Sequence, residues 1–199
     1  MKRILLIRHG RTAANDRHLY CGSTDLSLSP EGRAALEELR RRGGYPAPTG
    51  FRVVTSGMRR AEETLSILYG EIEHRRIPDL REVDFGAFEM RGYEELRLDG
   101  AYIAWCEGDN RRNVPPGGES GESMGNRVLS AFRTLAEEDG DLLIVSHGGP
   151  IAAIMEAMFP AEGKNLYEWQ PGHGRGYQIV LDGQERSWEP VPERGQENE

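Results

Sequence analysis

Lysine, cysteine and long apolar runs are all scarce in this chain of 199 residues. Its only lysines are Lys2 and Lys164, so guanidinium groups carry nearly all of the positive charge, a bias that genomic composition explains without any function. Two cysteines, Cys21 and Cys106, are too few for a disulfide scaffold and favour a reducing compartment, the cytoplasm. No apolar run approaches the ~18 residues that cross a bilayer. The apolar stretch after Arg3 has only four residues, too few for a signal peptide.

Charge and composition narrow the class of protein further. With 25 basic and 33 acidic residues the formal net charge is -8, which disfavours nucleic acid and anionic membranes as partners. Hydrophobic residues make up 37% of the chain, enough for one sizeable core. Domains usually hold roughly 100–200 residues. We therefore predict a single domain over residues 1–183, with an insertion or lid at about 86–118 and a polar C-terminal tail over 184–199.

Strand-like and helix-like segments alternate along the chain. The hydrophobic pattern predicts strands over residues 3–8, 51–55 and 141–146, with a late strand, placed at a sheet edge, over 177–181. It predicts helices over 29–42, 56–68 and 121–138, and a further helix that ends at about 158. Strands that alternate with helices favour an α/β fold with a parallel sheet.

Polar clusters follow three of these strands directly. Arg8 and His9 follow the first strand, Arg60 lies just after the second, and His147 follows the third. Ligands of parallel α/β sheets bind outside the carboxyl ends of the strands, so we expect these four side chains to converge. Two guanidiniums and the amides of nearby helix N-termini suit a tetrahedral dianion such as phosphate. An unprotonated imidazole beside them is a nucleophile toward phosphorus, and a second imidazole can donate to the developing charge.

Four segments, which span residues 6–15, 55–64, 80–89 and 146–149, form one ordered set of motifs. Together they resemble the histidine phosphatase superfamily, which includes the cofactor-dependent phosphoglycerate mutases. The resemblance runs from residue 4 to about residue 159. It implies a three-layer α/β/α sandwich with a mostly parallel central sheet and a small helical insertion.

The resemblance also implies catalytic roles for His9, Glu82 and His147. His9 would attack the phosphoryl group and form a phosphohistidine, while His147 would hold a phosphoryl oxygen. Glu82 would protonate the leaving alkoxide and then activate the water that releases phosphate. The residues alone do not favour Glu82 over Glu89 or Asp84, so this assignment depends on the resemblance.

Substrate-binding roles follow in the same way. The resemblance assigns phosphate binding to four positions, which are Arg8, Asn15, Arg60 and the amide of Gly148. No metal or other cofactor is expected, because guanidinium and imidazole groups replace a Lewis acid. The expected partner is a small phosphorylated substrate, and the sequence predicts no oligomeric state.

Hydrolysis is favoured over mutase-type phosphoryl transfer. A mutase usually has extra segments that hold its intermediate, whereas this chain is short and residues 170–176 leave little material for a covering tail. The segment Phe88-Glu89-Met90-Arg91 resembles the α-ribazole phosphatase branch, and a broad-specificity phosphomonoesterase is nearly as well supported. The predicted activity is a metal-independent phosphomonoesterase that acts on a small metabolite, with α-ribazole 5'-phosphate as one candidate.

Three other interpretations stay open. Cys106, with Arg112 six residues later, has the spacing of a cysteine-phosphatase loop, but Glu107 and Asp109 would put carboxylates where a dianion must bind. We instead expect Cys106 to be a buried small residue beside Trp105. A zinc hydrolase is disfavoured because the remaining histidines are scattered. A catalytically silent phosphoester-binding scaffold is disfavoured because both motif histidines and a candidate acid are present.

Overall fold

The computed structural model describes residues 1–109 and 111–192, and within them one sheet has six strands in the order β3-β2-β4-β1-β5-β6. The strands are β1 (Lys2–Arg8), β2 (Phe51–Thr55), β3 (Arg75–Arg76), β4 (Asp141–Ser146), β5 (Gly176–Asp182) and β6 (Glu185–Val191). The first four are parallel, whereas β5 and β6 run antiparallel to their neighbours. The sheet is therefore mostly parallel, as the resemblance implies.

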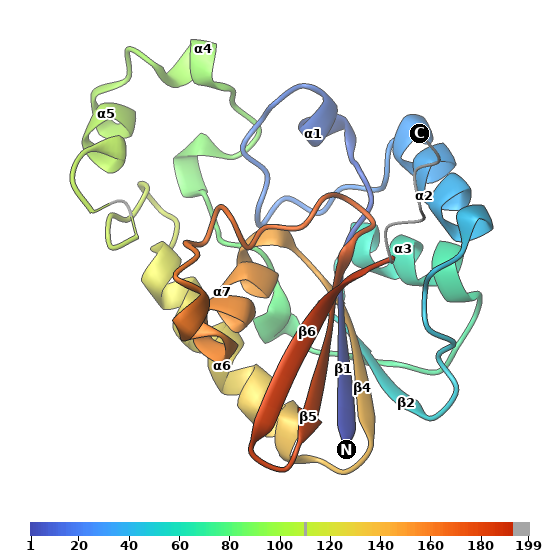
Figure 1. Ribbon diagram of the computed structural model, residues 1–199. Coiled ribbons are helices and arrows are strands. Elements are labelled where there is room, and N and C mark those ends of the chain that lie inside the picture. Colours follow the sequence, from blue (N-terminus) through green and yellow to red (C-terminus); the bar gives the residue numbers. More distant parts are fainter. Residues whose placement is uncertain (110, 193–199) are drawn as a thin grey trace, which may run out of the picture.

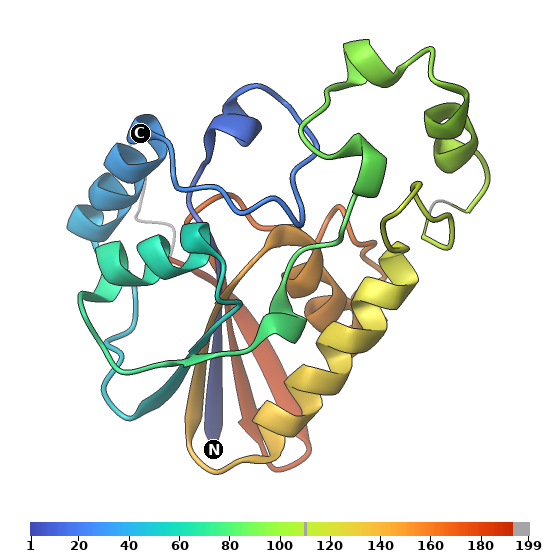
Figure 2. The same cartoon turned by 180° about the vertical axis from the view of Figure 1, so that it is seen from behind.

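Helices cover both faces of the sheet and complete the expected three-layer sandwich (Figures 1 and 2). One face carries α2 (Pro30–Arg42) and α3 (Arg59–Tyr69), and the other carries α6 (Gly121–Glu137) and α7 (Gly148–Met158). Ser29 caps α2 by accepting the N–H of Gly32, and Pro30 takes the first helical position. None of the helices in the described ranges is long and apolar enough to cross a membrane.

The strand β1 shows why the central strands have continuous apolar sequences. Ile4 and Leu6 pack in the core beneath α6 and α7, while Leu5 and Ile7 pack in the core beneath α2 and α3. Side chains alternate between the faces of a sheet, and both faces here are covered. All four side chains are completely buried.

The helical insertion lies above the carboxyl ends of the parallel strands (Figure 1). It contains the 3-10 turn η2 (Gly86–Phe88) and the short helices α4 (Tyr93–Leu96) and α5 (Gly100–Cys106), which share a small apolar cluster. Trp105 packs within this cluster, but Cys106 is exposed at the end of α5, so the prediction of a buried cysteine is wrong. Residue 110, part of the segment with cysteine-phosphatase spacing, lies outside the described residues.

The predicted polar tail is wrong for residues 185–191, which form β6 instead. Pairing with β5 satisfies the backbone of this polar segment, and Trp188 packs with ring centroids 5.1 Å from Trp169 and 5.4 Å from Tyr177. Pro190, which lacks an N–H, is tolerated because β6 is an edge strand. The same pairing removes β5 from the edge position predicted for it, and residues 193–199 lie outside the described residues.

Candidate active site

Four side chains meet at the carboxyl edge of the parallel strands. Arg8 and Ser146 occupy paired positions in β1 and β4, so the residues that follow, His9 and His147, lie side by side, with ring centroids 5.0 Å apart. Arg60, in the first turn of α3, donates from Nε to Nδ1 of His147 over 3.2 Å. The predicted convergence is therefore confirmed, and we refer to Arg8, His9, Arg60 and His147 as the His/Arg cluster.

His9 is neutral, and a backbone carbonyl determines where its proton lies. The side chain is 5% exposed, and its Nδ1 lies 2.6 Å from the carbonyl oxygen of Gly10. A carbonyl oxygen can only accept a hydrogen bond, so Nδ1 is the donor. Burial, reinforced by the positive charge of Arg60, lowers the pKa of His9 well below its ordinary value. Nε2 consequently keeps a free lone pair at neutral pH, which a nucleophile requires.

Arg60 is completely buried and is held from three sides. Its Nη1 donates to the carbonyl oxygen of Thr24 over 2.8 Å, and its Nη2 donates to that of Gly22 over 2.7 Å. With the bond from Nε to His147, three of its five N–H groups are used. The two that remain belong to the terminal nitrogens and have no acceptor among the described residues.

Both ring nitrogens of His147 have protein partners. Nδ1 accepts from Arg60, so the proton of the neutral ring lies on Nε2, which donates to the hydroxyl of Ser56 over 2.8 Å. Burial and the charge of Arg60 lower the pKa of His147 well below its ordinary value. Ser56 therefore belongs to the site, although the sequence analysis placed it only at the start of the helix predicted over 56–68.

Arg8 brings a buried donor that has no acceptor among the described residues. Its Nη1 donates to the carbonyl oxygen of Pro171 over 2.8 Å, whereas its Nε is buried and unpaired. An unsatisfied buried donor costs about 1–3 kcal/mol, so a bound anion here would relieve that cost. A Cβ added to Gly148 would lie 3.1 Å from Cζ of Arg8, so the absence of a side chain keeps this guanidinium accessible from the N-terminus of α7.

Glu82 lies against the same helix terminus. Its Oε2 accepts the N–H of Gly149 over 3.1 Å, and its Oε1 accepts the N–H of Val83 over 3.0 Å. A Cβ on Gly149 would lie only 2.4 Å from Oε1 of Glu82, so glycine permits this close approach. The amide of Gly149, two residues after His147, thus holds the Glu82 carboxylate at the edge of the sheet where the His/Arg cluster lies.

Gly148 and Asn15, the other two predicted phosphate-binding residues, differ in their placement. Gly148 is the first residue of α7, where helical amides have no intrahelical acceptor. Asn15, the third residue of the short helix α1 (Ala13–Asp16), completes a capping box with the N-cap residue Thr12, and its Oδ1 accepts the amide of Thr12 over 2.9 Å and the Thr12 hydroxyl over 3.0 Å. The Asn15 oxygen therefore serves its own turn, and only its NH₂ group is suited to a substrate oxygen.

His173 is a site residue that the sequence analysis did not identify. Its ring centroid lies 5.4 Å from that of His9, and its Nδ1 lies 3.2 Å from the carbonyl oxygen of His9. Burial, together with the charge of Arg8, lowers the pKa of His173 to about 4. His173 lies in the loop before the antiparallel strand β5, so no parallel strand ends beside it in the sequence, and only the fold brings it to His9.

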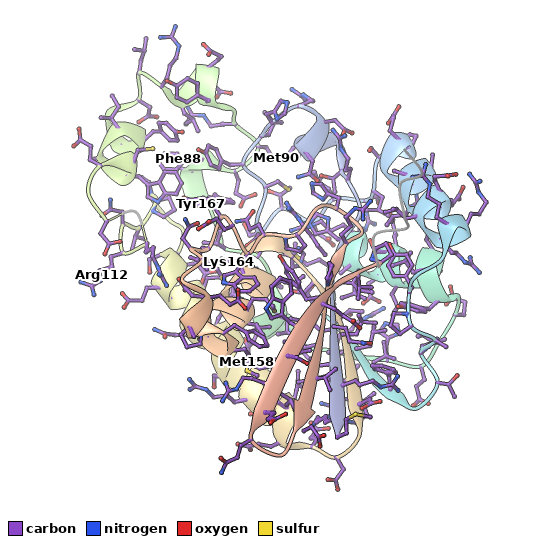
Figure 3. The ribbon with its side chains drawn as sticks, viewed as in Figure 1. Phe88, Met90, Arg112, Met158, Lys164 and Tyr167 are labelled. Carbon is purple, nitrogen blue, oxygen red and sulfur yellow. The ribbon has the colours of Figure 1, made fainter. Side chains whose placement is uncertain are left out.

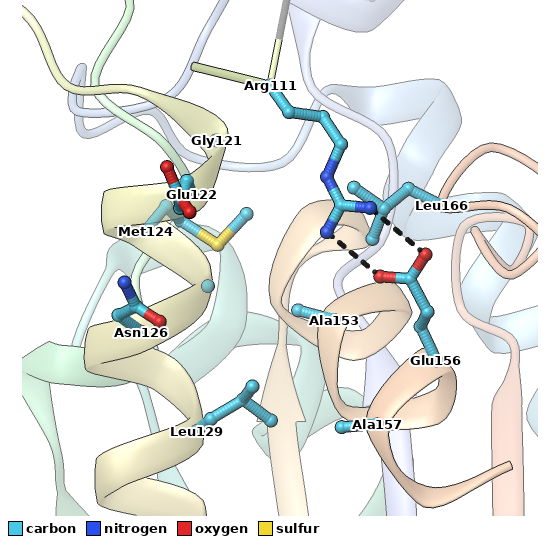
Figure 4. Close-up of a pocket in the computed structure, with 11 residues that line it drawn as sticks. Arg111, Gly121, Glu122, Met124, Asn126, Leu129, Ala153, Glu156, Ala157 and Leu166 are labelled. Carbon is cyan, nitrogen blue, oxygen red and sulfur yellow. Dashed lines mark hydrogen bonds and ion pairs between the residues drawn. The ribbon is translucent and has the colours of Figure 1, made fainter. Parts of the chain in front are cut away.

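A separate cavity of about 230 Å³ lies between α6 and α7 (Figure 4). The ion pair between Arg111 and Glu156, with nitrogen–oxygen distances of 3.1–3.2 Å, spans it, and Leu129 and Leu166 line it. Its lining includes neither motif histidine, so it is distinct from the His/Arg cluster.

Comparisons with known proteins agree with this geometry. The sequence profile of the histidine phosphatase superfamily (branch 1) matches residues 4–191. An adenosylcobalamin/alpha-ribazole phosphatase from Salmonella typhimurium is 31% identical over 185 residues, which cover 86% of this chain and 87% of that protein. A 2,3-bisphosphoglycerate-dependent phosphoglycerate mutase from Cytophaga hutchinsonii is 31% identical over 169 residues, which cover 76% and 75%.

Two solved structures described as alpha-ribazole phosphatases have the same fold as this chain. A putative alpha-ribazole-5'-P phosphatase from Escherichia coli superposes with a TM-score of 0.83 at 26% identity, over 94% of each chain. The alpha-ribazole phosphatase from Shigella flexneri gives 0.82 at 27% identity, over 98% of this chain and all of that one. The chain belongs to the histidine phosphatase superfamily. Its relatives within that superfamily include both phosphatases and phosphoglycerate mutases.

Proposed function

We propose that this enzyme hydrolyses small phosphate monoesters through a phosphohistidine on His9, without a metal ion. The observation that carries the proposal is the state of His9, which is neutral, buried and protonated at Nδ1 toward Gly10. Its nucleophilic nitrogen therefore needs no base to activate it. Arg8 and Arg60 lie beside it and can neutralise the dianion that it attacks.

The first step transfers the phosphoryl group to His9. Nε2 of His9 forms a bond to phosphorus as the bond from phosphorus to the ester oxygen breaks, and protonated Glu82 gives its proton to the leaving oxygen. In the second step Glu82 takes a proton from water, the oxygen of which attacks phosphorus and breaks the phosphorus–nitrogen bond. Phosphate leaves, and Glu82 is protonated again for the next cycle.

The developing charge on the phosphoryl oxygens has several donors available. The unused N–H groups of Arg60, the unpaired Nε of Arg8 and the amide of Gly148 can all contact these oxygens. His147 can join them when a phosphoryl oxygen takes the place of the Ser56 hydroxyl as the acceptor of its Nε2–H. Such preorganised donors stabilise a phosphoryl-transfer transition state without reorganisation.

For the substrate, we propose α-ribazole 5'-phosphate as the first compound to test. Relatives that carry this activity in their names align with 86% of the chain or more. The phosphoglycerate mutase relative supports phosphoglycerates as the second class. A panel that contains both classes, assayed for phosphate release and for isomerisation, distinguishes a hydrolase from a mutase.

Trapping the intermediate tests the mechanism. Wild-type enzyme mixed with ³²P-labelled substrate and quenched in alkali should retain label that acid releases, as a phosphohistidine does. His9→Ala should retain no label and should lose p-nitrophenyl phosphate turnover. His74→Ala is the matched control, because His74 pairs with Glu62 away from the His/Arg cluster. Full turnover by His9→Ala would exclude the covalent route, and a wild type without turnover on the whole panel would favour a silent scaffold.

A further inference from the structure

The carboxylate of Glu89 lies where two loops meet and accepts five hydrogen bonds. Its Oε1 accepts the N–H groups of Gly22, Ser23 and Phe85 over 2.9, 2.9 and 3.1 Å. Its Oε2 accepts the N–H of Thr24 over 3.2 Å and the Thr24 hydroxyl over 2.6 Å. Three consecutive backbone amides of one loop thus converge on one side chain from another loop.

The opposite side of the same loop faces Arg60. While the amides of Gly22 and Thr24 point to Glu89, their carbonyl oxygens accept the two terminal nitrogens of Arg60. Loop 22–24 therefore lies between a buried cation and a carboxylate, with its N–H groups directed to the carboxylate and its carbonyl groups directed to the cation.

The loop also contacts the segment that carries the candidate acid. A Cβ added to Gly22 would lie 1.6 Å from the carbonyl oxygen of Val83, the residue after Glu82, so the two backbones touch. The hydroxyl of Ser23 donates to Asp84 over 2.9 Å. Glu89 thus secures a loop that touches Arg60 on one side and the acid segment on the other.

We infer that Glu89 is a positioning residue that fixes loop 22–24 and, through its carbonyl groups, orients Arg60 toward the substrate phosphate. This inference rests on the proposed function, because it assumes that Arg60 binds the phosphoryl oxygens. Glu89 acts through Arg60, since the five donors to its carboxylate all come from the protein. Its charge matches five donors, whereas a glutamine would turn an NH₂ group toward some of them.

The loss of Glu89 should disorient Arg60 without removing it. Two of the three bonds that hold the guanidinium go to carbonyls of loop 22–24, so rotation of these peptide planes shifts its remaining N–H groups. A displacement of ~1 Å at a positioning group can cost about 100-fold in rate. The loss should therefore appear in oxyanion affinity and in kcat, beyond any loss of stability.

The first experiment compares Glu89→Gln with Glu63→Gln. Glu63 is a matched control because it also accepts a backbone amide, that of Leu28, and pairs with Arg33, but it does not contact loop 22–24. Calorimetric titration with orthovanadate should show binding about 10- to 100-fold weaker in Glu89→Gln. Glu63→Gln should keep wild-type affinity, and urea unfolding of both variants reports how much stability each has lost.

A second experiment places Glu89→Gln in an Arg60→Ala background. If Glu89 acts through Arg60, the substitution should weaken vanadate binding much less in that background than in the wild type. Thr24→Val removes only the hydroxyl bond to Glu89, keeps the Thr24 carbonyl group, and serves if Glu89→Gln does not fold. We expect Thr24→Val to weaken vanadate binding in the same direction by about 2- to 5-fold, since one net hydrogen bond is lost.

The outcomes separate this inference from the proposed function. Wild-type vanadate affinity in Glu89→Gln and in Thr24→Val, or an equal loss with and without Arg60, overturns the inference. A wild type that binds vanadate but turns over no phosphoester contradicts the proposed function, while the binding data still test Glu89. A wild type that binds neither vanadate nor inorganic phosphate overturns both.

Discussion

Three histidine rings lie together, with His9 and His147 buried and His173 partly buried, and the loss of contact with water lowers the pKa of each of them. Unfolded histidine binds a proton near pH 6.5, whereas these folded rings stay neutral to lower pH. The unfolded state therefore binds more protons below pH 6.5, and the free energy of unfolding falls as the pH falls. Each such histidine contributes a slope of about 1.4 kcal/mol per pH unit in this window.

The substitution His173→Gln tests this linkage. Glutamine does not titrate but can still donate to the carbonyl of His9, so the pH slope of stability between about pH 6 and 4.5 should become shallower by roughly 1 kcal/mol per unit. Urea unfolding at a series of pH values measures it. His74→Gln should change the slope in the opposite sense and only above about pH 6.5: burial lowers the pKa of His74, but the Ile72 carbonyl and Glu62 outweigh burial and raise it, so the protonated ring stabilises the fold until the pH rises through that pKa. An unchanged slope in His173→Gln would show that His173 titrates alike in both states.

Met90 has a backbone conformation that normally requires glycine, with φ at 59°. Figure 3 shows it near Phe88, between the α4–α5 segment and α1, and its N–H donates to the carbonyl of Tyr20 over 2.7 Å. This left-handed region costs a side-chain-bearing residue about 1–2 kcal/mol. Met90→Gly should therefore be about 1 kcal/mol more stable than Met90→Ala in urea unfolding, because both lack the side chain and only glycine relieves the backbone. Equal stability of the two variants would refute the strain.

The residues of the site divide into those that sequence could predict and those that it could not. His9 and His147 follow parallel strands, so chain direction alone predicts that they meet. His173 and Glu89 act through bonds to backbone groups of other loops, and such bonds leave no spacing in the sequence. The resemblance assigns the acid role to Glu82, because the residues alone give no physical reason to prefer it to Glu89.

Among the helices, α6 holds the acid segment through one side chain. Arg127 donates to the carbonyl oxygens of Glu82, Arg81 and Asp79 over 2.9, 2.8 and 2.9 Å, and it also pairs with Glu119. Glu119 in turn accepts the amide of Asp84 over 3.2 Å. The N-terminal half of α6 thus holds the backbone of the segment that carries Glu82, the proposed acid.

Replacing Arg127 should impair proton donation selectively. Arg127→Met should slow an alkyl phosphate about 10-fold more than p-nitrophenyl phosphate, because only a poor leaving group needs the acid. Glu82→Gln should show the same selectivity more strongly, by about 100-fold or more. The ratio of the two kcat/KM values measures this, and Arg111→Met is the control on the α6–α7 side of the molecule. Equal slowing of both esters would remove Arg127 and Glu82 from acid catalysis.

The edge strand β6 contributes stability rather than chemistry. Trp188 packs edge-to-face against Trp169 and Tyr177, its Nε1 donates to Glu162 over 3.1 Å, and Nζ of Lys164 lies 4.3 Å from its ring centroid (Figure 3 labels Lys164). Trp188→Ala should cost about 2–3 kcal/mol of unfolding free energy in urea, with vanadate affinity unchanged. Ser187→Ala is the control within the strand, and a loss of vanadate affinity in Trp188→Ala alone would connect β6 to the site. The hydrophobic pattern does not predict β6 because its side chains are mostly polar. The segment becomes a strand through its hydrogen bonds to β5.

At the scale of the whole molecule, the layered architecture was predictable because four apolar strand segments and four helical segments each carry a local signal in the sequence. The placement of the insertion over the strand ends was not, since it depends on contacts between loops. The bond between Tyr20 and Met90, for example, joins residues 70 positions apart in the chain.

Main-chain atoms, not side chains, define the separation between loop 22–24 and the acid segment, because Gly22 leaves no space beside the Val83 carbonyl. The spacing between the loop that contacts Arg60 and the segment that carries Glu82 therefore depends on a backbone contact at Gly22, which the Glu89 carboxylate reinforces from within the insertion. A single methyl group at position 22 would push the loop away from the Val83 carbonyl. It would lower the turnover of every ester alike rather than change which ester the enzyme prefers.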